Sequence, residues 1–204
     1  APFRKGDRYF HFRNTGLQNQ DVLYVSASPD DEGRVLIDPN TLSPDGTVAL
    51  TGLSVSWDGQ WVAYASSVSG SDWKTWHGRN VETGEDLPEL IHRSKFSGAA
   101  WLPDSTGFFY GRYSKPEGNE YAEANYNQRL YLHRLHTEQD DDELIYERSD
   151  HPKWGFGPIV TDDGAYLVLL VWQGSDRRNR VFYRQMSGGP VIELIPELEA
   201  GYEF

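Results

Sequence analysis

A short unit that occurs four times along the chain constrains the fold more than any other feature. In its clearest copy, Ser54 to Ser66 (SVSWDGQWVAYAS), an alternating stretch leads to Asp58-Gly59 and then to a more continuously apolar stretch. Asp-Gly between two such runs indicates a β-hairpin, because glycine readily adopts the positive φ that the tight turn needs. The other copies are Gly98 to Arg112, Pro158 to Val171 and, more faintly, Lys5 to Arg13.

The turns of these copies carry similar residues. We expect Asp104 and Gly107 at the turn of the copy that starts at Gly98, and Asp163-Gly164 at the turn of the next copy. Strand-like segments follow one another roughly every 12 residues, which is the spacing of a β-meander and not of βαβ units. With four such segments in each unit, the units start roughly 45 to 55 residues apart, which is typical of β-propeller blades.

The sequence therefore predicts an all-β fold, a β-propeller of about four four-stranded antiparallel blades. The second strand of each unit is the most apolar, as in Tyr166 to Val171 (YLVLLV), because neighbouring blades cover inner strands on both faces. A β-sandwich is the structural alternative, but it does not explain why the same order of strands recurs. We expect the blades at about 1–48, 49–95, 96–149 and 150–196, with 197–204 starting a further blade, and no helix of any length.

The bulk composition excludes several classes of partner. The net charge of -12 argues against nucleic acid and anionic membranes, both of which attract clustered Lys and Arg. No apolar run is long enough to span a membrane, and no signal peptide is visible. The absence of cysteine excludes disulfides and thiolate metal sites and fits a cytoplasmic location. The chain begins at Ala1 and not at Met, which suggests a processed or excised piece.

No cofactor or metal site is expected. The acidic run Asp140 to Glu143 could bind calcium through its carboxylates, but a solvated hairpin tip is the preferred interpretation. His133 and His136 are three residues apart on a predicted strand and would point to opposite faces. A nucleophile elbow, G-x-S-x-G, does not occur, and Ser71 lies in a predicted loop with no helix after it. The sequence therefore predicts no catalytic residue.

Five segments, spread in order over the chain, resemble the prolyl oligopeptidase (prolyl endopeptidase) family. They are NTGLQNQ (14–20), LIDPNTLSPDGTVAL (36–50), GSDWKT (70–75), KFSGAAW (95–101) and GFFY (107–110). The resemblance implies a seven-bladed propeller that gates the access of short proline-containing peptides to an α/β-hydrolase domain. The catalytic Ser, Asp and His of the family follow the propeller. This chain is therefore expected to be a partial arc of that propeller, with the catalytic domain absent.

The same resemblance implies which residues contact substrate or the catalytic domain. Phe96 matches an aromatic residue of the family's substrate pocket, and Asp72 matches an aspartate at the domain interface. Trp154-Gly155 and Ser175 also fall at pocket positions, where Gly155 replaces a larger apolar residue and Ser175 a cysteine. The alternatives from the residues alone are a core aromatic for Phe96 and a turn aspartate for Asp72.

A long insert, Tyr113 to Asn127, joins two predicted strands of the third unit. Its Pro, Gly and Glu content argues against a packed element, and the resemblance implies a loop that controls substrate access. The candidate access-loop residues are Tyr113, Pro116, Tyr121 and Tyr126. The alternative is a surface loop without a role.

Two classes of function follow. The preferred one is a non-catalytic propeller fragment whose partner is the hydrolase domain of the same parent chain. The alternative is a stand-alone or self-assembling propeller, associating through open blade edges, that binds a basic or neutral peptide or protein. A relative that cleaves after basic residues is a lesser rival for the parent enzyme.

Overall fold

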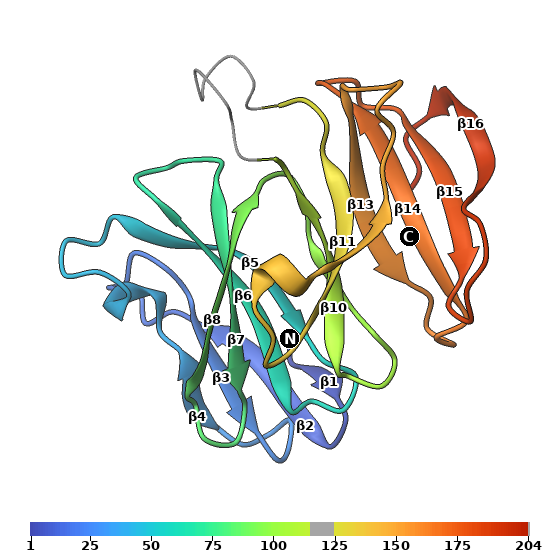
Figure 1. The fold of residues 1–204 in the computed structure, drawn as a ribbon. Helices are drawn as coiled ribbons and strands as arrows, with labels where there is room; N and C mark the ends of the chain where they lie inside the picture. Colours follow the sequence, from blue (N-terminus) through green and yellow to red (C-terminus); the bar gives the residue numbers. More distant parts are fainter. Residues whose placement is uncertain (115–124, 204) are drawn as a thin grey trace. The chain divides into compact units, whose positions relative to one another are not determined.

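The structure is a computed structural model that describes residues 1–114 and 125–203. The chain divides into two compact units, Ala1–His92 and Arg93–Phe204. Within the described residues, the regular elements are sixteen strands and two short 3-10 turns (Figure 1). None of the described helical turns is long or apolar enough to cross a membrane.

The first unit contains two four-stranded antiparallel sheets with strands in chain order. The first sheet consists of β1 (Phe3–Lys5), β2 (Arg8–Arg13), β3 (Val22–Ser26) and β4 (Arg34–Ile37). After the 3-10 turn η1 (Pro39–Thr41), the second sheet consists of β5 (Val48–Val55), β6 (Trp61–Val68), β7 (Lys74–Asn80) and β8 (Asp86–Ser94).

The core of this unit lies between its two sheets. Phe10 and Leu23 from the first sheet and Val62 and Tyr64 from the second are almost fully buried in one apolar cluster. Burying such side chains contributes about 1.5–3 kcal/mol each. Consecutive sheets therefore stack face to face, as blades do in a propeller.

Two turns of neighbouring sheets meet in the first unit and require glycine. Gly6 and Gly59 both have positive φ, 55° and 71°. A Cβ at Gly6 would overlap the backbone carbonyl of Asp58, and a Cβ at Gly59 would overlap that of Lys5. Glycine at these turns is thus needed both for the left-handed backbone and for the close approach of the two hairpins.

The second unit repeats the arrangement with two more antiparallel sheets. One consists of β9 (Ala99–Trp101), β10 (Gly107–Arg112), β11 (Arg129–Arg134) and β12 (Glu143–Tyr146), with the 3-10 turn η2 (Gln139–Asp141) before β12. The other consists of β13 (Trp154–Val160), β14 (Tyr166–Gln173), β15 (Asn179–Gln185) and β16 (Ile192–Ala200).

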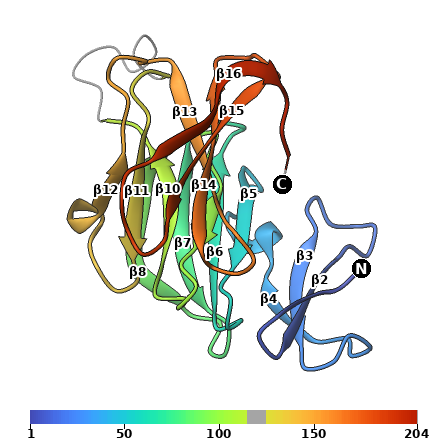
Figure 2. The same ribbon diagram turned by 90° about the vertical axis from the view of Figure 1, so that its right-hand side faces the viewer.

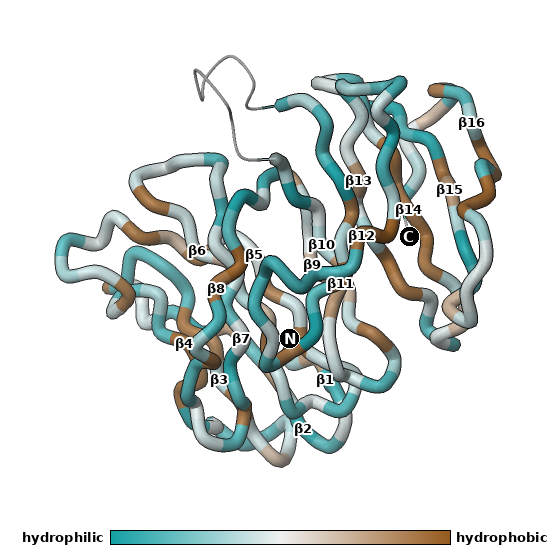
Figure 3. The backbone as a smooth tube through the Cα atoms, in the orientation of Figure 1, coloured by the Kyte–Doolittle hydropathy of each residue, from teal (hydrophilic) through white to brown (hydrophobic). Residues whose placement is uncertain are grey.

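The inner faces of these two sheets form the second core. Leu130 and Leu132 of one sheet pack in the same cluster as Phe156, Leu169 and Phe182 of the other. Figure 2 shows the β10–β12 strands beside β13 and β14, and Figure 3 shows the apolar stretch along β14. The apolar second strand that the sequence predicts is therefore present where two sheets stack.

The predicted fold class, four four-stranded antiparallel propeller blades, is confirmed. Two details of the prediction are wrong. Gly107 is the first residue of β10 and not part of the turn, where Ser105 instead has φ 61°. Glycine is still required at 107, because a Cβ would overlap the His133 carbonyl oxygen. Residues 197–200 belong to β16, and Ala200 pairs with Asn179, so they complete the fourth sheet.

The acidic run also differs from the prediction of a solvated hairpin tip. The Asp142 side chain is fully buried because it closes a polar network inside the third sheet. Its Oδ2 accepts a hydrogen bond from the Tyr110 hydroxyl (2.6 Å), and its Oδ1 lies 2.7 Å from His133 Nδ1. Burial first, and then the Asp142 carboxylate, raise the pKa of the Tyr110 hydroxyl.

An equivalent network occurs in the second sheet. Tyr64 donates to Asp86 Oδ2 (2.7 Å), and Arg79 Nε donates to Asp86 Oδ1 (2.6 Å). The basic residue has the same register in both sheets. Arg79 lies opposite Val62, two residues before Tyr64, and His133 lies opposite Phe108, two residues before Tyr110. This repeated network of a tyrosine, an aspartate and a basic residue ties the start of the fourth strand of a blade to the second and third strands.

Candidate functional site

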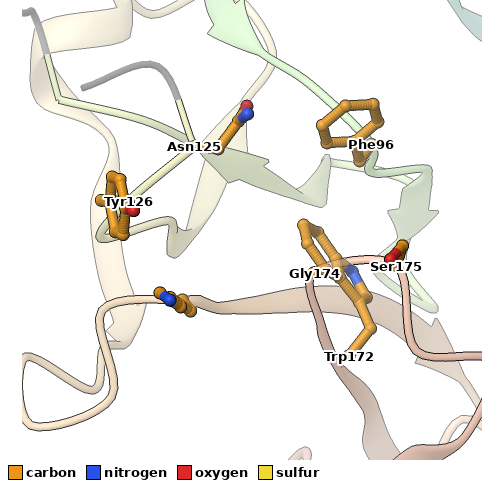
Figure 4. A pocket seen from close by; sticks show the side chains of 7 residues that line it. Phe96, Asn125, Tyr126, Trp172, Gly174 and Ser175 are labelled. Atoms are coloured by element: carbon orange, nitrogen blue, oxygen red, sulfur yellow. The ribbon is translucent and has the colours of Figure 1, made fainter. Parts of the chain in front are cut away.

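An open cavity of about 840 Å³ lies in the second unit. Its walls come from the end of β14 and from loops beside strand ends. Its described lining residues are Phe96, Asn125, Tyr126, Lys153, Trp172, Gly174 and Ser175. Figure 4 shows the Phe96 and Trp172 rings close to each other, with Ser175 near them and Tyr126 farther across the cavity. Three of these residues are aromatic, and Lys153 carries the one charge among them. Such a surface suits an apolar ring better than a charged group.

Phe96 has a backbone conformation that is unfavourable for its residue type. It lies between β8 and β9 with φ 56°, in the left-handed region that costs a non-glycine residue of order 1–3 kcal/mol. Its side chain is 47% exposed, so core packing does not account for this conformation. The flanking residues Lys95 and Ser97, in contrast, are buried.

Buried hydrogen bonds on both sides of Phe96 hold it in this conformation. The Ser94 hydroxyl donates to the Gly111 carbonyl (2.8 Å), and the Gly111 N–H donates to the Ser97 hydroxyl (2.9 Å). Both serines thus fasten the segment to one residue of β10. A Cβ at Gly111 would lie 2.9 Å from Ser97 Cβ, so only glycine allows this close approach.

The buried Gln128 side chain adds a second anchor. Its Nε2 donates to the Lys95 carbonyl (2.9 Å), and its Oε1 accepts from the Phe156 N–H (2.6 Å). This amide joins the segment before Phe96 to β13 of the next sheet. The strain at Phe96 therefore persists because the neighbouring residues are fixed, as is usual at binding sites.

Trp172 forms the wall next to Phe96. The two rings make an edge-to-face contact, with centroids 5.9 Å apart and planes at 88°. Trp172 lies directly opposite Gly155 in the pairing of β14 with β13, and a Cβ at Gly155 would overlap the indole ring. The indole therefore occupies the space that a side chain at position 155 would need.

Trp154 is buried and is not among the residues that line the cavity. Its ring is flanked by the guanidinium groups of Arg148 and Arg180, at 4.6 and 4.3 Å from the ring centroid. Its Nε1 donates to Gln173 Oε1 (3.1 Å). Burial lowers the pKa of Arg180. Trp154 thus holds Gln173, the residue that follows Trp172, in place next to the cavity wall.

The structure brings together some of the sequence-predicted residues and not others. Phe96, Ser175 and Tyr126 line the cavity, and Gly155 lies against its Trp172 wall. Tyr113 is buried outside the lining, where its N–H donates to the Arg93 carbonyl (2.9 Å). Asp72 is exposed in the loop between β6 and β7 of the first unit. Pro116 and Tyr121 lie outside the described residues.

The described lining residues can bind a ligand through stacking and polar contacts. Among them, no group of three or more His, Asp or Glu side chains could hold a metal ion. The buried His133–Asp142 pair is engaged with Tyr110 inside the third sheet. What the lining can supply is ring stacking, a cation and a few polar groups.

A family model of the prolyl oligopeptidase N-terminal beta-propeller domain matches residues 1–204. The chain belongs to the prolyl oligopeptidase family. It is 38% identical to prolyl oligopeptidase A of Galerina marginata over 88% of this chain and 28% of that protein. It is 41% identical to a prolyl endopeptidase of Elizabethkingia meningoseptica over 83% of this chain and 24% of that protein.

Solved structures of the family agree with the fold. A prolyl endopeptidase superposes with a TM-score of 0.87 at 36% identity, covering 97% of this chain and 28% of its own. Prolyl oligopeptidase B of Galerina marginata, bound to a 35mer hydrolysis and macrocyclization substrate, gives 0.88 at 29% identity, covering 100% of this chain and 32% of its own. The chain thus spans about a quarter to a third of the length of the relatives it matches.

Sequence reasoning within the prolyl oligopeptidase family missed Asn125, Lys153, Trp172 and Gly174 as lining residues. Trp172 could have been found from the predicted hairpin. Pairing Phe156 with Val171 and Pro158 with Leu169 places Trp172 opposite Gly155. A large side chain then lies opposite a residue that has no side chain. Lys153 and Gly174 carry no signal of their own, because loop residues become neighbours only through the packing of strands.

Proposed function

We propose that this chain is the substrate-facing part of the propeller of a peptidase that cleaves short peptides after proline. It takes no part in bond cleavage and instead helps to select and admit peptides. The observation that carries this proposal is the aromatic cavity with Phe96 held in a strained, half-exposed conformation. Strain maintained by a buried network, next to open space, is more typical of a binding site than of a core residue.

The catalytic groups would come from a hydrolase domain of the same parent chain. The relatives' length beyond the matched portion leaves room for such a domain. Asp72, in an exposed loop, would contribute to the contact with it. The access-loop role of 113–127 follows from the same proposal, and Tyr126 is its described residue on the cavity wall.

Phe96→Ala in the full-length parent enzyme tests the proposal. Loss of the exposed ring should raise KM for short proline-containing peptides about tenfold, in line with the loss of one aromatic contact of about 1–1.5 kcal/mol. The effect on kcat should be small, because the residue contributes uniform binding. Unchanged KM and kcat across several peptides would remove Phe96 from the substrate pocket.

Asp72→Ala in the same enzyme tests the contact between domains. We expect lower activity and a lower midpoint of thermal unfolding, because a polar contact between the propeller and the catalytic domain would be lost. A change in neither would show that Asp72 serves only its own loop. The 204-residue chain alone should leave all peptides uncleaved, and hydrolysis by it would contradict the proposal directly.

A further inference from the structure

The cavity has an aromatic corner that no other described part of its wall reproduces. The Trp172 ring meets the Phe96 ring edge to face, at 5.9 Å and 88°, so the two rings present surfaces at right angles to the same space. Both are held in place, Phe96 by the hydrogen bonds on either side of it and Trp172 by its position over Gly155. A ring that enters this corner can contact one face and one edge at once.

The corner exists only because position 155 is glycine. Any side chain there would overlap the indole of Trp172 and push it from its place. Gly155 has no positive φ, so the backbone does not require glycine. The requirement is one of space, and it makes Gly155 and Trp172 a matched pair across β13 and β14.

The rest of the lining limits what else can bind. Lys153 is the charged residue among the described lining residues, and no carboxylate lies among them. A peptide with a Lys or Arg side chain would meet a like charge without a counter-charge in the lining. An aliphatic side chain would fit but would lose the ring geometry. The volume of about 840 Å³ is within the range of small-ligand sites and accommodates an aromatic side chain.

We propose that Trp172, seated on Gly155, makes this cavity selective for short peptides that carry an aromatic side chain. Peptides with an aliphatic side chain at the same position bind more weakly, and those with a basic one more weakly still. This inference rests on the proposed function of the cavity as a peptide-contact site. Trp172 and Gly155 are specificity-determining residues in it, and neither takes part in bond cleavage.

The chain offers a matched control for Gly155. Gly157 lies two residues away on β13, and its side of the strand faces the same way. A Cβ at Gly157 would lie 3.8 Å from Leu170, which is ordinary van der Waals contact. The same substitution should therefore displace Trp172 when made at Gly155 and leave it in place when made at Gly157.

The experiment measures peptide binding to the 204-residue chain by calorimetric titration. The probes are acetylated Xaa-Gly-Pro amides that differ only in Xaa, which is Phe, Leu or Lys. For the native chain we expect the Phe peptide to bind roughly fivefold to tenfold more tightly than the Leu peptide, the gain expected from one added edge-to-face contact. Gly157→Ala should keep this ratio, and Gly155→Ala should reduce it to about one.

A spectroscopic readout separates displacement of the indole from general damage. The indole N–H resonance of Trp172, assigned with Trp172→Phe, should shift in Gly155→Ala and stay in place in Gly157→Ala. If Gly155→Ala does not fold, Trp172→Leu carries the test, because it removes the ring from a site that is only partly buried. It too should bring the Phe-to-Leu ratio to about one.

The outcomes separate the inference from the proposed function. Peptide binding without an aromatic preference, or a preference that survives both Gly155→Ala and Trp172→Leu, overturns the inference and leaves the proposed function standing. Failure of the native chain to bind any of the peptides overturns both. Loss of the preference in Gly155→Ala or Trp172→Leu, together with its retention in Gly157→Ala, supports the inference.

Discussion

Replacing Asp142 with asparagine should destabilise the protein far more than the same change at Asp86. Both aspartates accept a hydrogen bond from a tyrosine of the second strand and pair with a basic residue of the third. They differ in burial, since the Asp142 side chain is 0% exposed and that of Asp86 is 35% exposed. The pair of variants therefore compares a buried copy of the network, in which His133 is the basic partner, with a partly exposed copy, in which Arg79 is the basic partner.

The magnitude follows from the contacts that are lost. Hydrogen bonds to a charged group contribute about 1.5–3 kcal/mol each, and water cannot replace those of a buried partner. Asp142→Asn weakens the contacts to Tyr110 and His133, so we expect a loss of about 3–4 kcal/mol in the free energy of unfolding. Asp86→Asn should cost about 1 kcal/mol, because solvent takes over part of the interaction.

Urea denaturation followed by circular dichroism measures both values. At about 2–4 °C per kcal/mol for a chain of this size, Asp142→Asn should also lower the Tm by about 6–16 °C, against about 2–4 °C for Asp86→Asn. Equal losses in the two variants would refute the reasoning, because burial would then have no part in the energy of the network. Tyr110→Phe serves as a control that removes no charge; it removes the hydrogen bond to Asp142 and the one that the Tyr110 hydroxyl accepts from Gln139 Nε2.

Two further predictions concern backbone strain and pH. Phe96→Gly should leave the free energy of unfolding unchanged or raise it by up to about 1 kcal/mol, since glycine adopts φ 56° without strain. The same variant should bind peptides more weakly, because the ring is lost. Clear destabilisation in urea would show that the ring has a packing role. Burial alone would raise the pKa of Asp86, but hydrogen bonds from Arg79 and Tyr64 outweigh burial and lower this pKa below 3.8. The unfolded state therefore takes up this proton first as the pH falls below about 4, and the stability from Asp86 is lost as the pH passes through the folded-state pKa. The difference in Tm between the native chain and Asp86→Asn should shrink between about pH 4 and pH 2, and a constant difference would contradict the assignment.

The repeat, the strands and the family can all be predicted from local sequence patterns. Alternation and Asp-Gly turns are local signals, and a hairpin forms from residues that are neighbours along the chain. The positive φ at Gly59 and Gly164 follows from such signals, and the apolar run at 166–171 indicates a β-strand. Only one face of that strand, formed by Leu167, Leu169 and Val171, is fully buried, and not both faces as predicted. The family resemblance rests on segments that can be read in order without any structure.

The environment of individual side chains depends instead on the tertiary fold. Asp142 belongs to an acidic run for which the sequence predicts exposure to solvent. Its side chain is nevertheless buried, because Tyr110 and His133 on the neighbouring strands β10 and β11 contact it. Phe96 has a left-handed backbone because residues 15 to 60 positions away fix its neighbours. Trp172 lines the cavity because another strand presents a glycine beneath it. Burial and close approach depend on which distant segments meet, and local sequence patterns carry little information about that.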